Sequence, residues 1–278
     1  MHTLMLHGHA TSAFIFKAQT GQFRSKLDKS FTFDFVNAPI PSELPLSLKR
    51  IFKTAYTWVD DRTNVEAIRH TANWLLEYME KNGPYDCVCC FSQSAAIVVT
   101  LVLDNNFRPP EDKKPLPFKS IVFMNASLEY SVFEDHGLPI TQEAQDFKLA
   151  SEKILYAKAN DLQNLANIMT LRSRGTADMW KDTSALLHDA SVLPPVKDCF
   201  GLDFTAFPPA AFITDIPTVH IYGEKDPICP SGIQLAYLCR AGKENMYNHQ
   251  GGHDVPRSPK VAVDVAASFK KLAKMIGQ

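Results

Sequence analysis

The chain has 278 residues, of which 45% are hydrophobic and 21% are charged. These proportions are those of an ordinary globular protein, and the length is enough to bury one large core. The 29 basic and 30 acidic residues leave a formal charge of −1, which gives no general attraction to nucleic acid or to an anionic membrane. We therefore expect neither of these as a partner, and we expect a small molecule of modest polarity instead.

Three of the six cysteines, Cys87, Cys89 and Cys90, lie together in an apolar run. A disulfide framework needs spaced cysteines in a short secreted chain, and a zinc site needs paired ligands at regular spacing. The N-terminal segment lacks the basic region of a secretory signal, and no apolar run approaches the roughly 18 residues that span a bilayer. These features predict reduced thiols, a cytoplasmic location, and no bound metal or cofactor.

Short apolar segments alternate with segments of helical periodicity, which indicates a mostly parallel central sheet with helices on both faces. The strands are expected at residues 3–6, 31–36, 86–91, 120–125, 218–222 and 244–248. A capping box at residues 63–66 predicts the start of one helix. Another helix is expected at residues 94–103, and a final helix is expected to begin after Ser258.

Residues 127–215 break this alternation. Helices are expected there at residues 142–159, 162–172 and 178–187, followed by a loop rich in proline. A long insertion without strands, placed between two strands of a sheet, is typical of a cap over a site. We therefore predict a single domain over residues 1–278, with residues 127–215 as a mobile helical cap.

Ser92 lies where the strand at residues 86–91 meets the following helix, within the sequence CFSQS. A sharp turn at such a junction exposes a serine hydroxyl at the carboxyl edge of the sheet, and the helix N-terminus directs backbone N–H groups at negative charge. The usual pattern for this turn is G-x-S-x-G, and here Cys90 and Ser94 replace the two glycines. On this motif alone, the serine could also be only a helix cap.

Two later loops supply the partners that such a serine needs, in the order Ser, Asp, His. Asp226 follows the strand at residues 218–222, and His253 follows the strand at residues 244–248 after two glycines. Because the carboxyl ends of parallel strands meet at one edge of a sheet, the three side chains are expected to lie together. We therefore predict an α/β-hydrolase fold with Ser92, Asp226 and His253 as the catalytic residues.

The negative charge that develops during acyl transfer needs two backbone N–H donors, which form an oxyanion hole. One donor is the residue after the serine, Gln93, and the other comes from the loop after the first strand. In that loop Gly8 permits a turn that directs the N–H of His9 inward. The backbone N–H groups of His9 and Gln93 are therefore predicted to form the oxyanion hole, whereas the ring of His7 is expected only to fill space.

His249 and His253 have the i, i+4 spacing of a zinc-binding helix. Gly251 and Gly252 lie between them and disfavour a helix, and no glutamate stands where a metalloprotease needs its base. We therefore expect no metal at these histidines.

Five short motifs of the chain occur together in one known family. They are LHG at residues 6–8, NAP at 37–39, FSQ followed by Ala95, G-x-x-D ending at Asp226, and GGH-x-V-P at 251–256. With these motifs the chain resembles the fungal "family of serine hydrolases" (FSH), over nearly its whole length and least in the region 127–215. Ser92, Asp226 and His253 match the positions of the family's triad, and Cys90 and Ser94 depart from its glycines.

This resemblance implies an esterase or thioesterase that cleaves acyl substrates through an acyl-enzyme. Among the reactions that the resemblance implies is the release of a polyketide chain from the carrier domain of a synthase in secondary metabolism. Aromatic and methionine side chains in the loops and the cap suit a long acyl chain, although most such residues serve ordinary packing. The candidate substrate contacts are Phe14, Trp58, Met169 and Trp180.

Two other interpretations stay open on the sequence. One is a carboxylesterase or lactonase for small substrates, or a hydrolase-fold enzyme repurposed for a non-hydrolytic step such as cyclisation. The other is an inactive binding protein of the same fold, which the bulk of Cys90 in the elbow favours and the complete set of serine, aspartate and histidine disfavours. Labelling by a fluorophosphonate probe would separate a catalyst from a binder.

Overall fold

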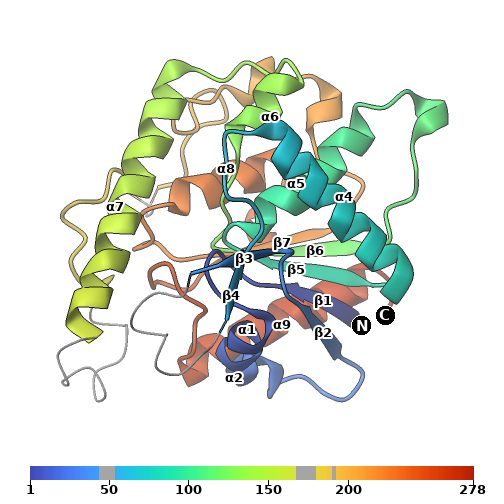
Figure 1. The fold of residues 1–278 in the computed structure, drawn as a ribbon, viewed down its shortest axis with the longest axis horizontal. Coiled ribbons are helices and arrows are strands. Elements are labelled where there is room, and N and C mark those ends of the chain that lie inside the picture. The colour runs from blue at the N-terminus through green and yellow to red at the C-terminus, as the bar shows by residue number, and fades with distance from the viewer. Residues whose placement is uncertain (44–53, 167–179, 190–191) are drawn as a thin grey trace.

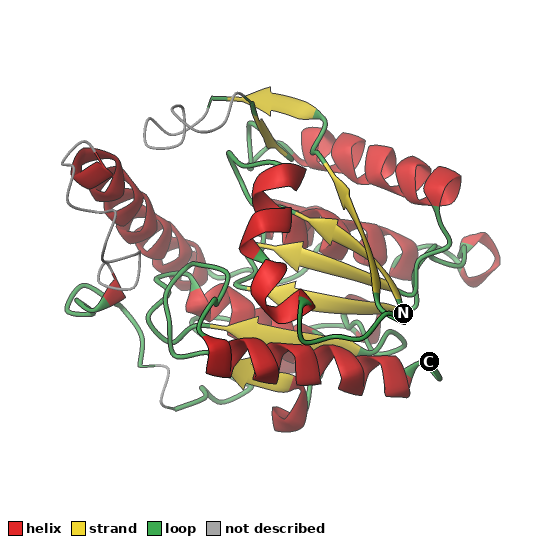
Figure 2. Cartoon of the chain, turned by 90° about the horizontal axis from the view of Figure 1, so that it is seen from below, coloured by secondary structure: helices red, strands yellow, loops and turns green. Residues whose placement is uncertain are grey.

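The computed structural model describes residues 1–43, 54–166, 180–189 and 192–278. Its centre is a six-stranded parallel sheet in the order β2-β1-β5-β6-β7-β8 (Figures 1 and 2). The strands are β1 (His2–Leu6), β2 (Thr32–Val36), β5 (Cys87–Phe91), β6 (Ser120–Met124), β7 (Thr218–Tyr222) and β8 (Met246–Asn248). Each begins and ends within two residues of its predicted position, so the predicted α/β sheet is confirmed.

The pairings in this sheet are all parallel. The loops that follow β1, β5, β6, β7 and β8 therefore open at the same edge. In an open α/β sheet this carboxyl edge is where ligands bind.

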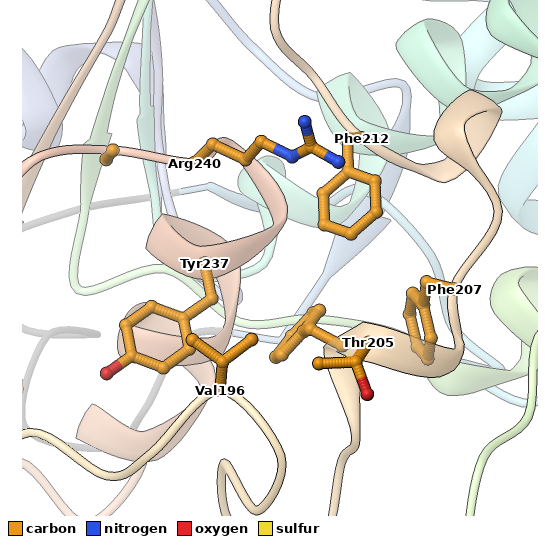
Figure 3. A pocket seen from close by; sticks show the side chains of 8 residues that line it. Val196, Thr205, Phe207, Phe212, Tyr237 and Arg240 are labelled. Carbon is orange, nitrogen blue, oxygen red and sulfur yellow. The ribbon is translucent and has the colours of Figure 1, made fainter.

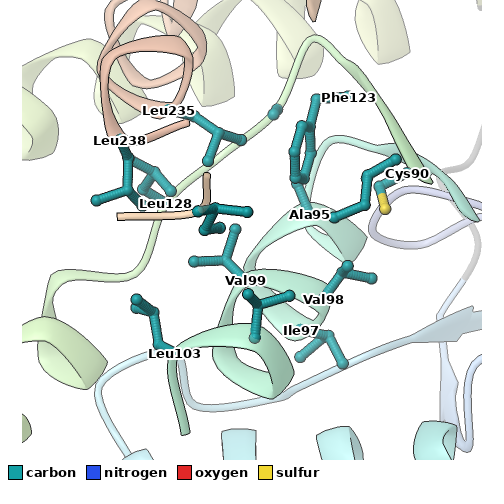
Figure 4. Close-up of a cluster of buried hydrophobic side chains, with 14 of the residues drawn as sticks. Cys90, Ala95, Ile97, Val98, Val99, Leu103, Phe123, Leu128, Leu235 and Leu238 are labelled. Atoms are coloured by element: carbon teal, nitrogen blue, oxygen red, sulfur yellow. The ribbon is translucent and has the colours of Figure 1, made fainter. Parts of the chain in front are cut away.

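The helices cover both faces of the sheet (Figure 2). Helices α4 (Val65–Asn82), α5 (Ser94–Asn106) and α8 (Cys229–Leu238) contribute to one hydrophobic core, and helices α1 (Ala13–Gln19), α2 (Gly21–Arg24) and α9 (Pro259–Met275) contribute to the other. Alternate residues of the central strands serve the two cores, since Cys90 belongs to the first and Cys89 to the second. Figure 4 shows the first core around α5, where Ala95 and Val99 lie among Phe123, Leu128 and Leu235.

Two helix starts can be compared with the predictions. Helix α9 begins after Ser258, whose side chain accepts a hydrogen bond from the Val261 N–H, as predicted. The capping box is wrong by one residue, because the N-cap of α4 is Asn64. The Thr63 side chain instead hydrogen-bonds to Asp61 in the preceding turn.

A small second sheet was not predicted. Strands β3 (Ile40–Ser42) and β4 (Ala55–Thr57) pair antiparallel. Each has three residues, which is too short to show the alternation that identifies a strand in a sequence. The sheet matters for the site because its last residue, Thr57, lies beside the loop that follows β1.

Between β6 and β7 the described chain is helical or irregular. Helix α6 (Tyr130–Asp135) is followed by α7 (Gln142–Ala166), a single helix where two were predicted. The residues Asn160 and Asp161 at the predicted break have low helix propensity, but neither removes a backbone donor as proline would. In Figure 1, α7 lies outside the sheet at one end of the molecule.

The helix predicted at residues 178–187 is wrong in its described part. Residues 181–187 form turns and bends. Asp182 explains part of this, because its carboxylate accepts hydrogen bonds from both the N–H and the hydroxyl of Ser184 and so competes with helix formation. Short 3-10 helices complete the chain: η1 (Pro110–Asp112), η4 (Phe204–Ala206), η5 (Pro209–Ala211) and η6 (Lys243–Asn245). In the described part of the chain, we find no helix with the length and apolar character needed to cross a bilayer.

Candidate active site

Ser92 occupies a strained turn between β5 and α5. Its φ is +56°, a left-handed conformation that residues with a side chain seldom adopt. Its N–H donates to the Met124 carbonyl at 3.1 Å, and its carbonyl accepts from the Ala95 N–H at the start of α5. These contacts hold the turn that exposes a serine hydroxyl at the carboxyl edge of the sheet, as the elbow motif predicts.

The two residues that replace glycine in the elbow motif are both buried. Cys90 is completely buried in the core beneath the turn, where burial raises the pKa of its thiol well above the usual value. The hydroxyl of Ser94 accepts from the Phe91 N–H at 3.0 Å and lies within hydrogen-bond distance of the Leu6 and Phe91 carbonyls. Ser94 therefore ties the elbow to β1.

The structure brings Ser92, His253 and Asp226 together. The Nδ1 atom of His253 is 2.8 Å from Oδ2 of Asp226, and its Nε2 atom is 2.9 Å from Oγ of Ser92. Because an ionised carboxylate only accepts, Nδ1–H donates to Asp226, and Nε2 is left to accept the Ser92 proton. Asp226 is 1% exposed, and its other oxygen accepts from the Ile228 N–H at 2.9 Å.

The loop after β1 lies directly against Ser92. A Cβ atom added to Gly8 would come within 2.8 Å of the Phe91 ring and 3.3 Å of the Ser92 Cβ. Only glycine fits this close approach. Gly8 therefore brings the next residue, His9, close to the elbow.

The side chains of the two predicted oxyanion donors are linked through Thr57. The Thr57 hydroxyl donates to Oε1 of Gln93 at 2.8 Å and accepts from Nδ1 of His9 at 2.8 Å. Gln93 is further held by the Trp58 N–H at 3.0 Å. Within the described residues, no hydrogen-bond acceptor is found for the backbone N–H of either His9 or Gln93.

His7 has a structural place in this loop. Its Nε2 accepts from the Ala38 N–H at 3.0 Å, so its Nδ1–H donates to the Gly8 carbonyl at 2.7 Å. Burial lowers the pKa of His7 to about 4, which keeps the ring neutral as both contacts require.

The predicted substrate contacts have different environments. Phe14 is 70% exposed on α1. Trp58 is completely buried and its indole donates to the His7 carbonyl at 2.7 Å, so it presents no surface to a substrate. Trp180 is buried and packs on Gly252, where an added Cβ atom would overlap the indole ring. Met169 lies outside the described residues.

Sequence reasoning missed Asn125 and its hydrogen bond to His249. Asn125 follows β6, and its side chain bonds to the loop around His253. Both ring nitrogens of His249 are engaged, one by the Gly251 N–H and one by Asn125. The spacing of two histidines thus reflects a hydrogen-bond network, and no group of potential metal ligands occurs among the described residues.

A separate pocket with a volume of about 490 Å³ lies at the end of α8 (Figure 3). Its lining is largely aromatic, and the Arg240 guanidinium lies 4.2 Å from the centre of the Phe212 ring. Ser92, Asp226 and His253 are not among the residues that line it. It is therefore distinct from the candidate active site.

Several known proteins are similar to this chain over nearly its whole length. Esterase alnB of Emericella nidulans is 26% identical over 277 residues, covering 96% of this chain and 93% of that protein. Hydrolase FUB4 of Fusarium oxysporum f. sp. lycopersici is 26% identical over 266 residues, covering 92% of each. Among solved structures, acyl-protein thioesterase 2 of Zea mays matches with a TM-score of 0.49 and 15% identity, over 99% of this chain and 94% of that one.

A family model settles the relationship. The model described as serine hydrolase (FSH1) matches residues 1–265. This match agrees with the parallel sheet, and with a serine at the elbow that lies within hydrogen-bond distance of a histidine. The chain belongs to the FSH1 family of serine hydrolases and is an enzyme.

Proposed function

We propose that the protein hydrolyses acyl esters or thioesters with Ser92 as nucleophile, His253 as base and Asp226 as the acid that orients the base. The observation that carries this proposal is the continuous hydrogen-bonded chain from Ser92 through His253 to Asp226. A serine is a weak nucleophile until a neighbouring base removes its proton. The buried Asp226 supplies the charge that stabilises the imidazolium formed in that step.

The reaction follows in two steps. His253 takes the Ser92 proton as Oγ attacks the acyl carbonyl, and it returns the proton to the leaving group when the tetrahedral intermediate collapses to an acyl-enzyme. His253 then activates a water molecule, which attacks the acyl-enzyme and releases the acid and free Ser92. A thioester suits this site because a thiolate leaves readily.

The oxyanion hole in this proposal consists of the N–H groups of His9 and Gln93. The contact of Gly8 with the elbow and the Thr57 bridge between the two side chains support it. In comparable sites one such donor contributes about 3 kcal/mol to stabilisation of the transition state.

We further propose a single domain in which residues 127–215 form a cap beside the site. Two described contacts of this segment reach the catalytic loops. Trp180 covers Gly252 next to His253, and His188 Nε2 lies 3.2 Å from the Glu224 carbonyl in the loop of Asp226. A cap in this position would line the path of the acyl group.

The proposed substrate is a long acyl chain, such as a polyketide, that is attached to a small leaving group or to a carrier protein. The carrier and the polyketide rest on the family resemblance. Burying each additional CH₂ contributes about 0.8 kcal/mol, so kcat/KM should rise by up to about fourfold per methylene until the site is full. We expect this climb in a series of p-nitrophenyl esters and acyl thioesters. A profile that peaks at acetyl would instead favour a small-ester hydrolase.

A buried ion cluster attaches α7 to the core. Arg62 pairs with Glu129 and lies 3.1 Å from Glu152 on α7, while Lys148 of the same helix pairs with both carboxylates. The Glu129 side chain is 4% exposed, and its burial raises its pKa despite the two nearby cations. The cluster therefore depends on all of its partners being present.

Replacing Arg62 by methionine should destabilise the protein by about 3–5 kcal/mol, because it leaves the buried Glu129 and the partly buried Glu152 with one cation. Denaturant unfolding would measure this change. Arg69→Met is the matched control, since Arg69 also pairs with two carboxylates but in a more exposed place. We expect the control to cost less than about 1 kcal/mol. Equal losses in the two variants would contradict a special role of the Arg62 cluster.

A further inference from the structure

Asn125 stands directly after β6 with its backbone fixed at the carboxyl edge of the sheet. Its φ is +42°, in the left-handed region that asparagine adopts more readily than most residues. Its N–H donates to the Ile221 carbonyl of β7 at 2.8 Å. The residue is 2% exposed, so its amide group points into the protein.

The side-chain amide of Asn125 bonds to the backbone on both sides of His253. Its Nδ2 atom donates to the Gly252 carbonyl at 3.2 Å and to the Asp254 carbonyl at 2.9 Å. The Asp254 N–H also donates to the Gly252 carbonyl at 2.9 Å, which closes the turn. His253 thus projects from a turn whose two flanking carbonyls share one amide donor.

His249 determines which way this amide faces. The Gly251 N–H donates to Nδ1 of His249 at 3.2 Å, so in the neutral ring the proton is on Nε2. Nε2–H then donates to Oδ1 of Asn125 at 3.1 Å. Burial lowers the pKa of His249 to about 4, so the ring stays neutral at the pH of most assays. With Oδ1 engaged by His249, Nδ2 must face the two carbonyls.

We propose that Asn125, oriented by His249, is a positioning residue that sets the imidazole of His253 between Asp226 and Ser92. This inference rests on the proposed catalytic role of His253. The bond to Asp226 fixes one ring nitrogen, but the ring can pivot about that contact unless its backbone is also held. In a catalytic site a misplacement of about 1 Å costs on the order of 10²-fold in rate.

The test replaces Asn125 by aspartate and, separately, by glycine. Aspartate and glycine both accept the left-handed backbone. Aspartate places a carboxylate against the two carbonyls, and glycine removes the side chain. We expect each variant to lose on the order of 10²-fold in kcat for acyl ester hydrolysis while KM stays unchanged. Circular dichroism and thermal melting would establish the folded fraction at the assay temperature.

A conservative pair at position 249 tests the orienting step. The amide of glutamine can replace Nε2–H as the donor to Asn125, but phenylalanine has no donor. We expect His249→Phe to lower kcat as the Asn125 variants do, and His249→Gln to recover most of it. Asn106→Asp is the matched control for Asn125→Asp, because its amide also bonds a backbone carbonyl, that of Phe212, outside the catalytic loops.

Wild-type kcat in both Asn125 variants would overturn the inference, as would equal losses in His249→Gln and His249→Phe. A loss of activity that only follows the loss of folded protein would overturn it as well. Failure of the proposed function gives a different result. In that case Ser92→Ala would keep its activity, whereas failure of the inference alone leaves Ser92→Ala inactive.

Discussion

Replacing Ser92 by alanine is expected to abolish labelling by a fluorophosphonate probe and to lower kcat for acyl esters by on the order of 10⁶, as loss of the nucleophile does in other serine hydrolases. The reason is that, in the described part of the chain, the Ser92 hydroxyl is the one found within hydrogen-bond distance of Nε2 of His253. Gel fluorescence and steady-state kinetics would measure the two effects.

The control for this variant is Ser268→Ala on α9, where the hydroxyl bonds only to the Asp264 carbonyl among the described residues. The control should label and turn over as the wild type does. Persistent labelling of Ser92→Ala at the wild-type rate would show that another residue is the nucleophile.

Asp226→Asn should keep the fold and lower kcat by on the order of 10⁴. The amide that replaces the carboxylate no longer fixes the proton on Nδ1 of His253, and it cannot stabilise the imidazolium. Kinetics with the same esters would measure the loss, and circular dichroism would check the fold.

Two other carboxylates serve as comparisons. Asp254 adjoins the base, and Asp215 is exposed on the approach to β7. We expect Asp215→Asn to be fully active. Near-normal activity in Asp226→Asn, together with a large loss in Asp254→Asn or Asp215→Asn, would mean that the acid lies in a different loop.

Much of this site could be predicted because its residues follow strands. Ser92, Asp226 and His253 each come after an apolar segment that is long enough to be identified, and parallel strands direct their carboxyl ends to one edge. The order of the three residues along the chain then limits the fold to a few possibilities. The geometry follows from topology, so it did not require knowledge of the contacts.

The residues that support the site could not be predicted in this way. Thr57 links His9 to Gln93 from a three-residue strand, and Asn125 bonds to residues more than 120 positions later. Each has an unremarkable sequence neighbourhood, because its role depends on distant backbone groups. The available signal for Asn125 is that a polar residue follows a buried strand. The sequence prediction instead includes Asn125 in the strand at residues 120–125.

The segment 127–215 shows the limit of helical periodicity. Its helices were predicted from the spacing of apolar residues alone. This spacing identified α7 but divided it into two helices. It also predicted a helix where Asp182 forms a local turn with Ser184. The contacts that hold this segment, such as Arg62 with Glu152, join residues that no local pattern relates. The attachment of this segment to the rest of the chain could therefore not be predicted from the sequence.

The acyl-enzyme offers the most direct test of the proposed chemistry. The protein would be mixed with a long-chain acyl thioester, quenched in acid within the first turnover, and digested for mass spectrometry. We expect the acyl group on the peptide that contains Ser92, in the wild type but not in Ser92→Ala, and we expect the adduct to accumulate in Asp226→Asn if deacylation slows more than acylation. Turnover of the thioester with no adduct on that peptide, or with the acyl group on another residue, would contradict the assignment of Ser92 as the nucleophile.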